Sequence, residues 1–202
     1  MMNGLETYHN VLSKESCEKI IELFDNDKRK LKGETAAGIS DSKKSTDIGV
    51  IFDKSEWEEY NKLILPPIVT LASNIKEKYP FLDDEGCSHW ILCPFWNVQH
   101  YKDGEGYFAT HCEHSYKNSY RMMAWMIYLN DADCGTEFPY QDTVVEAEQG
   151  KGVIWSAGWT HPHKGVTPNI GNKYIATGWF NYYDPKENLR RQRQKKVSKG
   201  FG

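Results

Sequence analysis

The chain has 202 residues, of which 39% are hydrophobic and 13% aromatic. This length and composition are typical of one globular domain with a sizeable core, and they exclude a disordered protein. The formal net charge of −3 gives no general attraction to nucleic acid or to a membrane surface. No apolar run approaches a membrane span, and the start MMNGLETYHN lacks the apolar stretch of a signal peptide. We therefore expect a soluble, cytoplasmic protein.

The cysteines are scattered along the chain and include no CxxC pair. They are Cys17, Cys87, Cys93, Cys112 and Cys134. This spacing favours free thiols in a reducing compartment over a disulfide framework or a zinc cluster.

The first predicted element is a helix over residues 13–31, capped by Ser13 with Ser16 as a second choice, because apolar residues recur in it at helical spacing. The next segment, residues 32–47, is rich in Gly, Ser, Thr, Lys and Asp, and a short strand is expected over 49–52. The polar segment is interpreted either as a mobile lid over a substrate or as an ordinary exposed connection.

A second helical region is predicted over residues 55–79. Ser55 opens it, and acidic residues fill its first turn, where they suit the helix dipole. Pro66 and Pro67 fall inside the pattern, so we expect them to break or kink the helix or to start a new one.

From about residue 86 onward the sequence predicts short, aromatic-rich strands separated by Gly, Asp, Asn or Pro turns. The candidate strands are 89–101, 106–110, 121–130, 143–147, 151–156, 161–167 and 173–183. Strands at this spacing favour a sandwich or barrel over a parallel α/β sheet. The predicted fold class is therefore mainly β with supporting helices, an α+β arrangement.

A candidate metal site comes from histidines and one carboxylate. Residues i and i+2 of a strand point the same way, so His111 and Glu113 would share a face, with Cys112 on the other. Two imidazoles and a carboxylate are the donors of the iron(II) facial triad of non-haem oxygenases. His161 and His163 compete for the third position, and strand parity cannot choose between them because they are two residues apart.

A lysine ten positions after His163 gives a further signal. His163 and Lys173 flank the turn-like TPNIGN, so they could lie on paired antiparallel strands and face one cavity, which favours His163 over His161. A charged lysine pointing inward is costly unless it is paired. The carboxylate of a bound ligand such as 2-oxoglutarate would offset that cost through charge-assisted hydrogen bonds. Strand alternation places Ile175, Thr177 and Trp179 on the face of Lys173, and it places Tyr128 opposite to its apolar neighbours.

Several motifs in order resemble one known family. The segments YKDGEGYFATHCE, RMMAWMIYLND with GTEF, and HKGVTPNIGNKYIATGW are similar to the catalytic half of prolyl 4-hydroxylases in the iron(II)/2-oxoglutarate-dependent dioxygenase superfamily. The resemblance covers about residues 86–183 and is loose over 1–85. It implies a double-stranded β-helix (jelly roll) within a single domain 1–184, in which 1–85 give helical support and a lid and 86–184 form the core.

The resemblance also implies roles for individual residues. It assigns the iron ligands to His111, Glu113 and His163. It assigns 2-oxoglutarate binding to Tyr101, Tyr128, Lys173 and Thr177, and the approach to the substrate prolyl group to Arg121 and Trp179. The departure is Glu113, where the family usually has Asp, because the extra methylene moves the carboxylate by roughly 1.5 Å.

The implied activity is hydroxylation of prolyl residues in a peptide or protein, coupled to decarboxylation of 2-oxoglutarate to succinate and CO2. Fe(II), 2-oxoglutarate and O2 are the implied cofactors and co-substrates, with ascorbate as reductant. The alternatives are a free amino acid or other small substrate, and a non-catalytic metal-binding jelly roll. A third is an interaction module that acts through the basic tail 185–202, which has seven Lys or Arg between Lys186 and Lys199. Neither a membrane nor nucleic acid is expected as a partner.

Overall fold

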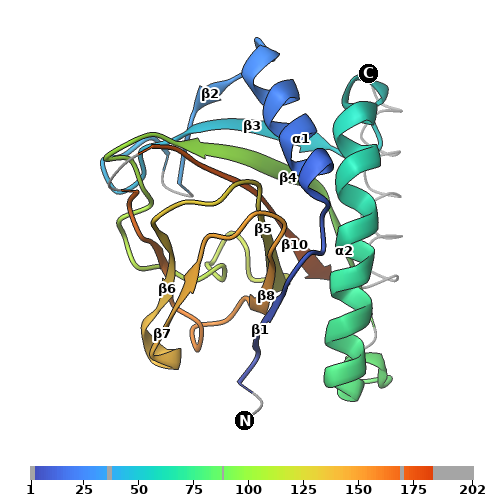
Figure 1. Cartoon of the computed structure of the whole chain (residues 1–202). Helices are drawn as coiled ribbons and strands as arrows, with labels where there is room; N and C mark the ends of the chain where they lie inside the picture. Colours follow the sequence, from blue (N-terminus) through green and yellow to red (C-terminus); the bar gives the residue numbers. More distant parts are fainter. Residues whose placement is uncertain (1–2, 36–37, 88, 169–170, 184–202) are drawn as a thin grey trace, which may run out of the picture.

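The computed structural model describes residues 3–35, 38–87, 89–168 and 171–183. The described residues form two long helices and two antiparallel sheets (Figure 1). The helices are α1 (Lys14–Asn26) and α2 (Glu58–Lys78). The strands are β1 (Leu5–Tyr8), β2 (Leu31–Lys32), β3 (Thr46–Ile51), β4 (Trp90–Tyr101), β5 (Arg121–Tyr128), β6 (Gly135–Phe138), β7 (Thr143–Glu146), β8 (Gly152–Ser156), β9 (Lys164–Gly165) and β10 (Lys173–Tyr182). Short 3-10 turns are η1 (Ser55–Trp57), η2 (Pro80–Asp83) and η3 (Pro139–Gln141).

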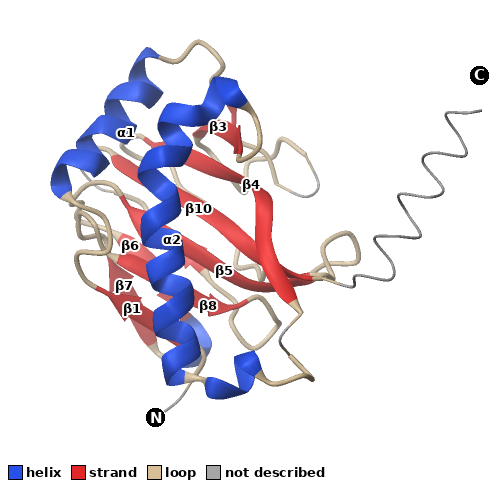
Figure 2. Ribbon diagram, turned by 90° about the vertical axis from the view of Figure 1, so that its right-hand side faces the viewer, coloured by secondary structure: helices blue, strands red, loops and turns tan. Residues whose placement is uncertain are grey.

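The larger sheet has seven strands in the order β1-β8-β5-β10-β4-β3-β2, and the smaller has three in the order β7-β6-β9. Both helices lie on one face of the larger sheet (Figure 2). The small sheet lies on its other side (Figure 1). The predicted class, mainly β with supporting helices, is confirmed.

The first helix begins as predicted but ends earlier. The Ser13 hydroxyl accepts a hydrogen bond from the Ser16 amide, which confirms Ser13 as the cap. The helix stops at Asn26 because the side chain of Asp27 accepts a hydrogen bond from the amide of Arg29 at 2.8 Å. This local bond forms an Asx-type turn, which competes with helix continuation.

The second helix runs through both prolines. Of the three alternatives expected at Pro66 and Pro67, a break and a new helix are wrong, since α2 is one helix from Glu58 to Lys78 (Figure 2), and a kink stays a prediction. Interior prolines cost about 3 kcal/mol or more, but apolar side chains on both sides of the pair are buried against the sheet, each contributing roughly 1.5–3 kcal/mol. These side chains are Ile64, Ile68, Leu71 and Ile75. Ser55 starts the preceding 3-10 turn rather than α2 itself.

Most predicted strands are present, and two predictions fail. Residues 106–110 form no strand, because the amide of Phe108 and the carbonyl of Gly106 bond to the loop at residues 42–44. The predicted strand over 161–167 contracts to the two residues of β9. The sequence reasoning missed β1 and β6 as strands, although GTEF of β6 was part of a motif.

Two further expectations concern the whole chain. Cys17, Cys87, Cys93, Cys112 and Cys134 are free thiols. Across the part of the chain that the structure describes, no helix is both long and apolar enough to cross a membrane. The basic tail, residues 185–202, lies outside the described residues.

Candidate metal centre

Three side chains from distant segments converge at one point. One ligating atom from each of His111, Glu113 and His163 lies within 4.8 Å of those of the other two. The segments meet through an isolated bridge, in which His111 and His163 exchange backbone hydrogen bonds of 2.9 and 2.8 Å. The expectation that His111 and Glu113 lie in a regular strand is wrong, because the amide of Glu113 instead bonds the carbonyl of Ala157 in a loop. The side chains of His111 and Glu113 nevertheless meet in the same cluster.

Both imidazoles are oriented by backbone carbonyls. Nδ1 of His111 lies 3.0 Å from the carbonyl oxygen of Ala109, and Nδ1 of His163 lies 3.0 Å from that of His161. Because a carbonyl only accepts, each Nδ1 carries the proton and each Nε2 keeps a lone pair for a metal. Burial, together with the nearby His163, lowers the pKa of His111 to about 4. His111 is therefore neutral at pH 7, as a metal ligand must be.

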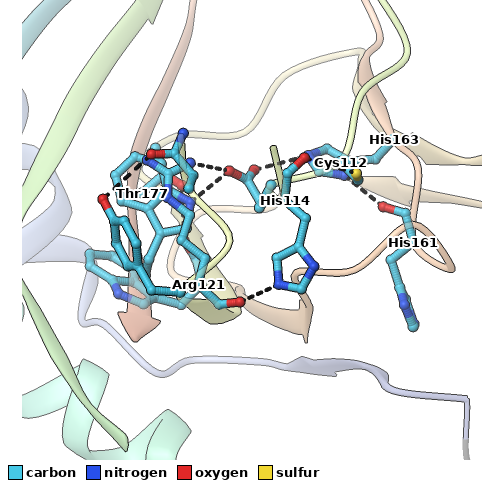
Figure 3. A network of polar contacts seen from close by, with 11 residues as sticks. Cys112, His114, Arg121, His161, His163 and Thr177 are labelled. Atoms are coloured by element: carbon cyan, nitrogen blue, oxygen red, sulfur yellow. Dashed lines mark hydrogen bonds and ion pairs between the residues drawn. The ribbon is translucent and has the colours of Figure 1, made fainter. Parts of the chain in front are cut away.

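The structure separates the two candidates for the third position. The imidazole of His161 bonds the carbonyl of Asn3 at 2.7 Å and the hydroxyl of Thr160 at 2.9 Å. Figure 3 shows it turned away from His163. His163 belongs to the cluster and His161 does not.

The carboxylate of Glu113 is held on both oxygens. Oε1 lies 3.4 Å from Nε2 of His163, while Oε2 accepts from Nη1 of Arg121 at 2.9 Å and from Nε1 of Trp179 at 2.6 Å (dashed lines in Figure 3). Burial by itself raises the pKa of this carboxyl, but the neighbouring His163 and the guanidinium group of Arg121 outweigh burial and hold the pKa well below its usual value. The group is therefore an anion at neutral pH.

A cavity of about 760 Å³ between the two sheets contains this cluster. The predicted co-substrate and substrate residues that line it are Tyr101, Lys173, Thr177, Arg121 and Trp179. The cavity is large enough for more than a metal ion, and pockets for small ligands are typically 300–1,000 Å³.

Lys173 reaches into this cavity from the larger sheet. It is only 2% exposed, and its ammonium group donates to the carbonyls of Val166 at 3.0 Å and Gly135 at 3.3 Å. No acidic side chain forms an ion pair with it among the described residues, and burial lowers its pKa. The expectation that His163 and Lys173 lie on paired strands is wrong: Lys173 lies on β10, which pairs with β4 and β5, whereas His163 lies just before β9 and forms its bridge with His111.

The three other predicted co-substrate residues differ in their access to the cavity. The hydroxyl of Tyr101 donates to Gln99 at 2.7 Å, and its ring centroid lies 4.9 Å from Nζ of Lys173. Thr177 donates its hydroxyl to the carbonyl of Trp125 at 2.9 Å. Tyr128 lies on the inner face as alternation predicted, but its hydroxyl bonds Thr136, and it is Thr136 rather than Tyr128 that lines the cavity.

Sequence reasoning missed a network of polar residues that also lines the cavity. Lys43 is buried, and its ammonium group pairs with Asp47 at 2.5 Å. Asp47 also accepts from Gln99 at 3.4 Å, its register partner across β3 and β4. The ring of Tyr107 stacks on His111 with centroids 3.8 Å apart. Strand alternation could have found Asp47 and Gln99, whereas Lys43 and Tyr107 lie in loops without a periodic signal.

Comparison with protein families identifies one match. Residues 96–181 match the family described as the 2OG-Fe(II) oxygenase superfamily. These residues include the whole candidate metal centre, Lys173 and both side chains that bind Glu113. No curated protein matches the sequence.

Solved structures with a similar fold include several prolyl hydroxylases. A collagen prolyl hydroxylase from Paramecium Bursaria Chlorella virus-1, in complex with 2OG, has a TM-score of 0.63 at 18% identity and covers 89% of this chain and 97% of its own. A Pseudomonas putida prolyl-4-hydroxylase has a TM-score of 0.67 at 18% identity, with 91% and 95% covered. A Trichoplax adhaerens prolyl hydroxylase in complex with a hypoxia inducible factor peptide fragment has a TM-score of 0.67 at 18% identity, with 93% and 87% covered. The resemblance predicted from the motifs is thus confirmed, in sequence for residues 96–181 and in fold for most of the chain.

Proposed function

We propose that this chain, which resembles prolyl 4-hydroxylase-like iron(II)/2-oxoglutarate oxygenases in its motifs and its fold, is a 2-oxoglutarate-dependent dioxygenase. The observation that carries the proposal is the convergence of His111, Glu113 and His163 in a cavity that also contains the buried ammonium group of Lys173, which has no ion-pair partner among the described residues. On this proposal the two sheets form a double-stranded β-helix in a single domain 1–184. Residues 1–85 then serve as helical support and lid, 86–184 as the core, and 185–202 as a basic tail.

The donor set fits iron(II). Two imidazoles, each held at Nδ1 by a backbone carbonyl, and one carboxylate are the donor set of the facial triad, which leaves positions open for other ligands. When bound, Fe(II) would supply activation of O2 coupled to oxidative decarboxylation of 2-oxoglutarate to succinate and CO2, with ascorbate as reductant. The contribution of His111 and His163 is orientation, because carbonyl partners at Nδ1 fix both rings before the metal arrives.

Lys173 supplies the charge that selects a dicarboxylate. The ammonium group is almost fully buried, and among the described residues its hydrogen bonds go to carbonyls alone, which is costly. The distal carboxylate of 2-oxoglutarate would offset that cost with a charge-assisted bond. Tyr101 and Thr177 line the same cavity and are proposed to contact the co-substrate. Tyr128 would support it from behind Thr136. Because Lys173 is only 2% exposed, little solvent reaches its ammonium group.

The proposed substrate is a prolyl residue in a peptide or protein. The structural neighbours that are prolyl hydroxylases support this, and one of them has a peptide bound. In this chain Arg121 and Trp179 line the cavity and would border the prolyl group. A second candidate, a metal-binding jelly roll without turnover, is favoured by one observation: Glu113 replaces the usual Asp, and its Oε2 is already occupied by two donors.

Succinate formation tests the proposal. The protein would be supplied with Fe(II), ascorbate and 2-oxoglutarate, alone and with proline-containing peptides, each matched to a peptide with alanine in place of proline. We expect turnover that rises with prolyl peptides and is lost in His111→Ala, Glu113→Ala and Lys173→Ala. Bound iron without turnover under any condition would favour the non-catalytic alternative, and an inability to bind iron would exclude both.

A further inference from the structure

The second oxygen of Glu113 has a role of its own. We propose that Arg121 and Trp179 are positioning residues that hold Oε2 of Glu113, so that the longer side chain presents only Oε1 to the metal. Together these two residues are called the carboxylate clamp. The inference rests on the proposed metal site, and it explains how a glutamate can serve where the family usually has an aspartate.

The clamp acts on one oxygen atom. Nη1 of Arg121 and Nε1 of Trp179 both donate to Oε2, at 2.9 and 2.6 Å, while Oε1 lies 3.4 Å from Nε2 of His163. The side chains of Arg121 and Glu113 are only 12% and 11% exposed, so water competes weakly for these bonds. Hydrogen bonds to an ionised acceptor are stronger than neutral ones. Oε2 is therefore fixed on the side of the clamp, and Oε1 faces the two imidazoles.

The clamp is itself rigid. The guanidinium carbon of Arg121 lies 3.6 Å from the centroid of the Trp179 ring, and the Phe95 ring lies 5.5 Å from that ring. Arg121 opens β5, and Trp179 follows Gly178 on β10, where the register with β4 shifts. The two donors thus come from neighbouring strands of one sheet and are held by stacking as well as by Glu113.

A glutamate needs this support more than an aspartate does. It has one more rotatable bond, so fixing its carboxylate costs more side-chain entropy, and it can also turn both oxygens toward the metal. An aspartate at the same backbone position would be shorter by roughly 1.5 Å and could not reach both the clamp and the metal. The clamp should therefore matter for Glu113 and have little effect on an aspartate there.

Cobalt(II) binding to the full chain provides a test that needs no turnover. Co(II) would be titrated into the wild type, Trp179→Phe, Glu113→Asp and the double variant, following the visible absorption that reports ligand geometry. Trp179→Phe removes the indole donor and keeps a ring for stacking. Trp159→Phe, at a tryptophan that is 76% exposed, is the matched control, and circular dichroism verifies that each variant is folded.

We expect Trp179→Phe to weaken Co(II) binding about tenfold and to change the absorption band in the Glu113 protein, since outer partners of metal ligands are typically worth about 10–100-fold. In the Glu113→Asp background the same substitution should change the affinity less than about twofold, because that carboxylate does not reach the indole.

Equal losses in both backgrounds would mean that Trp179 acts only by packing, and no change in either would mean that it does not position Glu113. Both results overturn the clamp and leave the metal site standing. His163→Ala sets the baseline for loss of the site. A wild type that behaves like His163→Ala would overturn the proposed function and the clamp together.

Discussion

The two faces of the seven-stranded sheet are built by the same strands and have opposite chemistry. The face under the helices is apolar and fully packed. Its side chains include Ile48, Val50, Trp96, Val98, Trp125, Ile127 and Ile154, which contact Ile20, Phe24, Ile64 and Leu71 of the helices. The face toward the small sheet contains polar and charged groups around a cavity. Its side chains include Asp47, Asn97, Gln99, Tyr101, Lys173 and Thr177.

The contrast follows from strand geometry. Neighbouring residues point to opposite faces, so a strand such as β10 places Ala176 and Phe180 in the apolar core and Lys173 and Thr177 in the cavity. Apolar burial on one face supplies the free energy of folding, and this allows the other face to keep groups that are costly to bury. We expect substitutions on the two faces to separate stability from ligand binding.

The largest effect is expected at the metal centre. His163→Ala should weaken Co(II) or Fe(II) binding on the order of 10³-fold, because it removes one of the three proposed protein ligands. His161→Gln, which changes a histidine bonded to Asn3 and Thr160, should leave the metal affinity within about threefold. Metal titration of both variants measures this difference. Equal losses of metal affinity in the two variants would mean that His161 contributes to metal binding as much as His163 does, which would contradict the structure.

Truncating a side chain on the apolar, helix-facing side of the sheet should lower stability and leave metal affinity unchanged. Ile64→Ala leaves a void in the fully buried apolar core and should lower the free energy of unfolding by about 2–5 kcal/mol. Denaturant unfolding measures this change, and metal affinity measured well below the midpoint should stay the same. A loss of metal binding in the folded variant would show that the two faces are coupled.

Lys173→Met should affect ligand binding and stability in opposite directions. It should weaken 2-oxoglutarate binding and stabilise the ligand-free protein. Loss of a bond between charged partners should reduce the affinity about 10–100-fold. Removal of a buried ammonium group should raise the free energy of unfolding by about 1 kcal/mol or more. Binding calorimetry and denaturant unfolding measure the two effects, and Lys173→Met that is less stable than wild type at pH 7 would contradict the second.

The gain in stability of Lys173→Met over the wild type should depend on pH. Burial lowers the pKa of Lys173 from its ordinary value of 10.5, so between these two pKa values the unfolded chain binds more protons than the folded protein at this site. The wild type therefore gains stability relative to Lys173→Met as the pH rises through that window toward 10.5. The difference between the two unfolding curves should shrink there, and a difference that is constant with pH would show that Lys173 is not destabilised by burial.

The smallest effect is expected at Thr177. Its hydroxyl donates to the carbonyl of Trp125, so Thr177→Val should cost about 1 kcal/mol of stability. Because the donor is used within the sheet, 2-oxoglutarate affinity should fall no more than about threefold. A larger loss of affinity would show that the hydroxyl of Thr177, and not only its methyl group, contacts the co-substrate.

Sequence reasoning predicted the parts of this molecule that follow from periodicity. The alternation of β5 and β10 assigned Trp125 to the core and Lys173 to the cavity side, and both assignments agree with the structure. It failed at the end of α1 and in the interior of α2: the local Asx-type bond of Asp27 ends α1 early, and the core holds α2 together through Pro66.

The same distinction applies to the candidate site. The residue types and order of His111, Glu113 and His163 could be predicted, but their meeting through a loop bridge could not, because no periodic pattern marks it. The bonds from Arg121 and Trp179 to Glu113 join β5, β10 and a loop, so they are visible only in three dimensions.

The most direct test of the central claim, that the polar face binds a metal and 2-oxoglutarate together, is calorimetric titration of 2-oxoglutarate with and without Mn(II). Mn(II) is used as a stand-in for Fe(II), and Lys173→Met is titrated in parallel. We predict binding of one 2-oxoglutarate per chain that requires the metal and is weakened at least about tenfold in Lys173→Met. Metal-loaded protein that does not bind 2-oxoglutarate, or binding that is indifferent to both the metal and Lys173, would contradict the account.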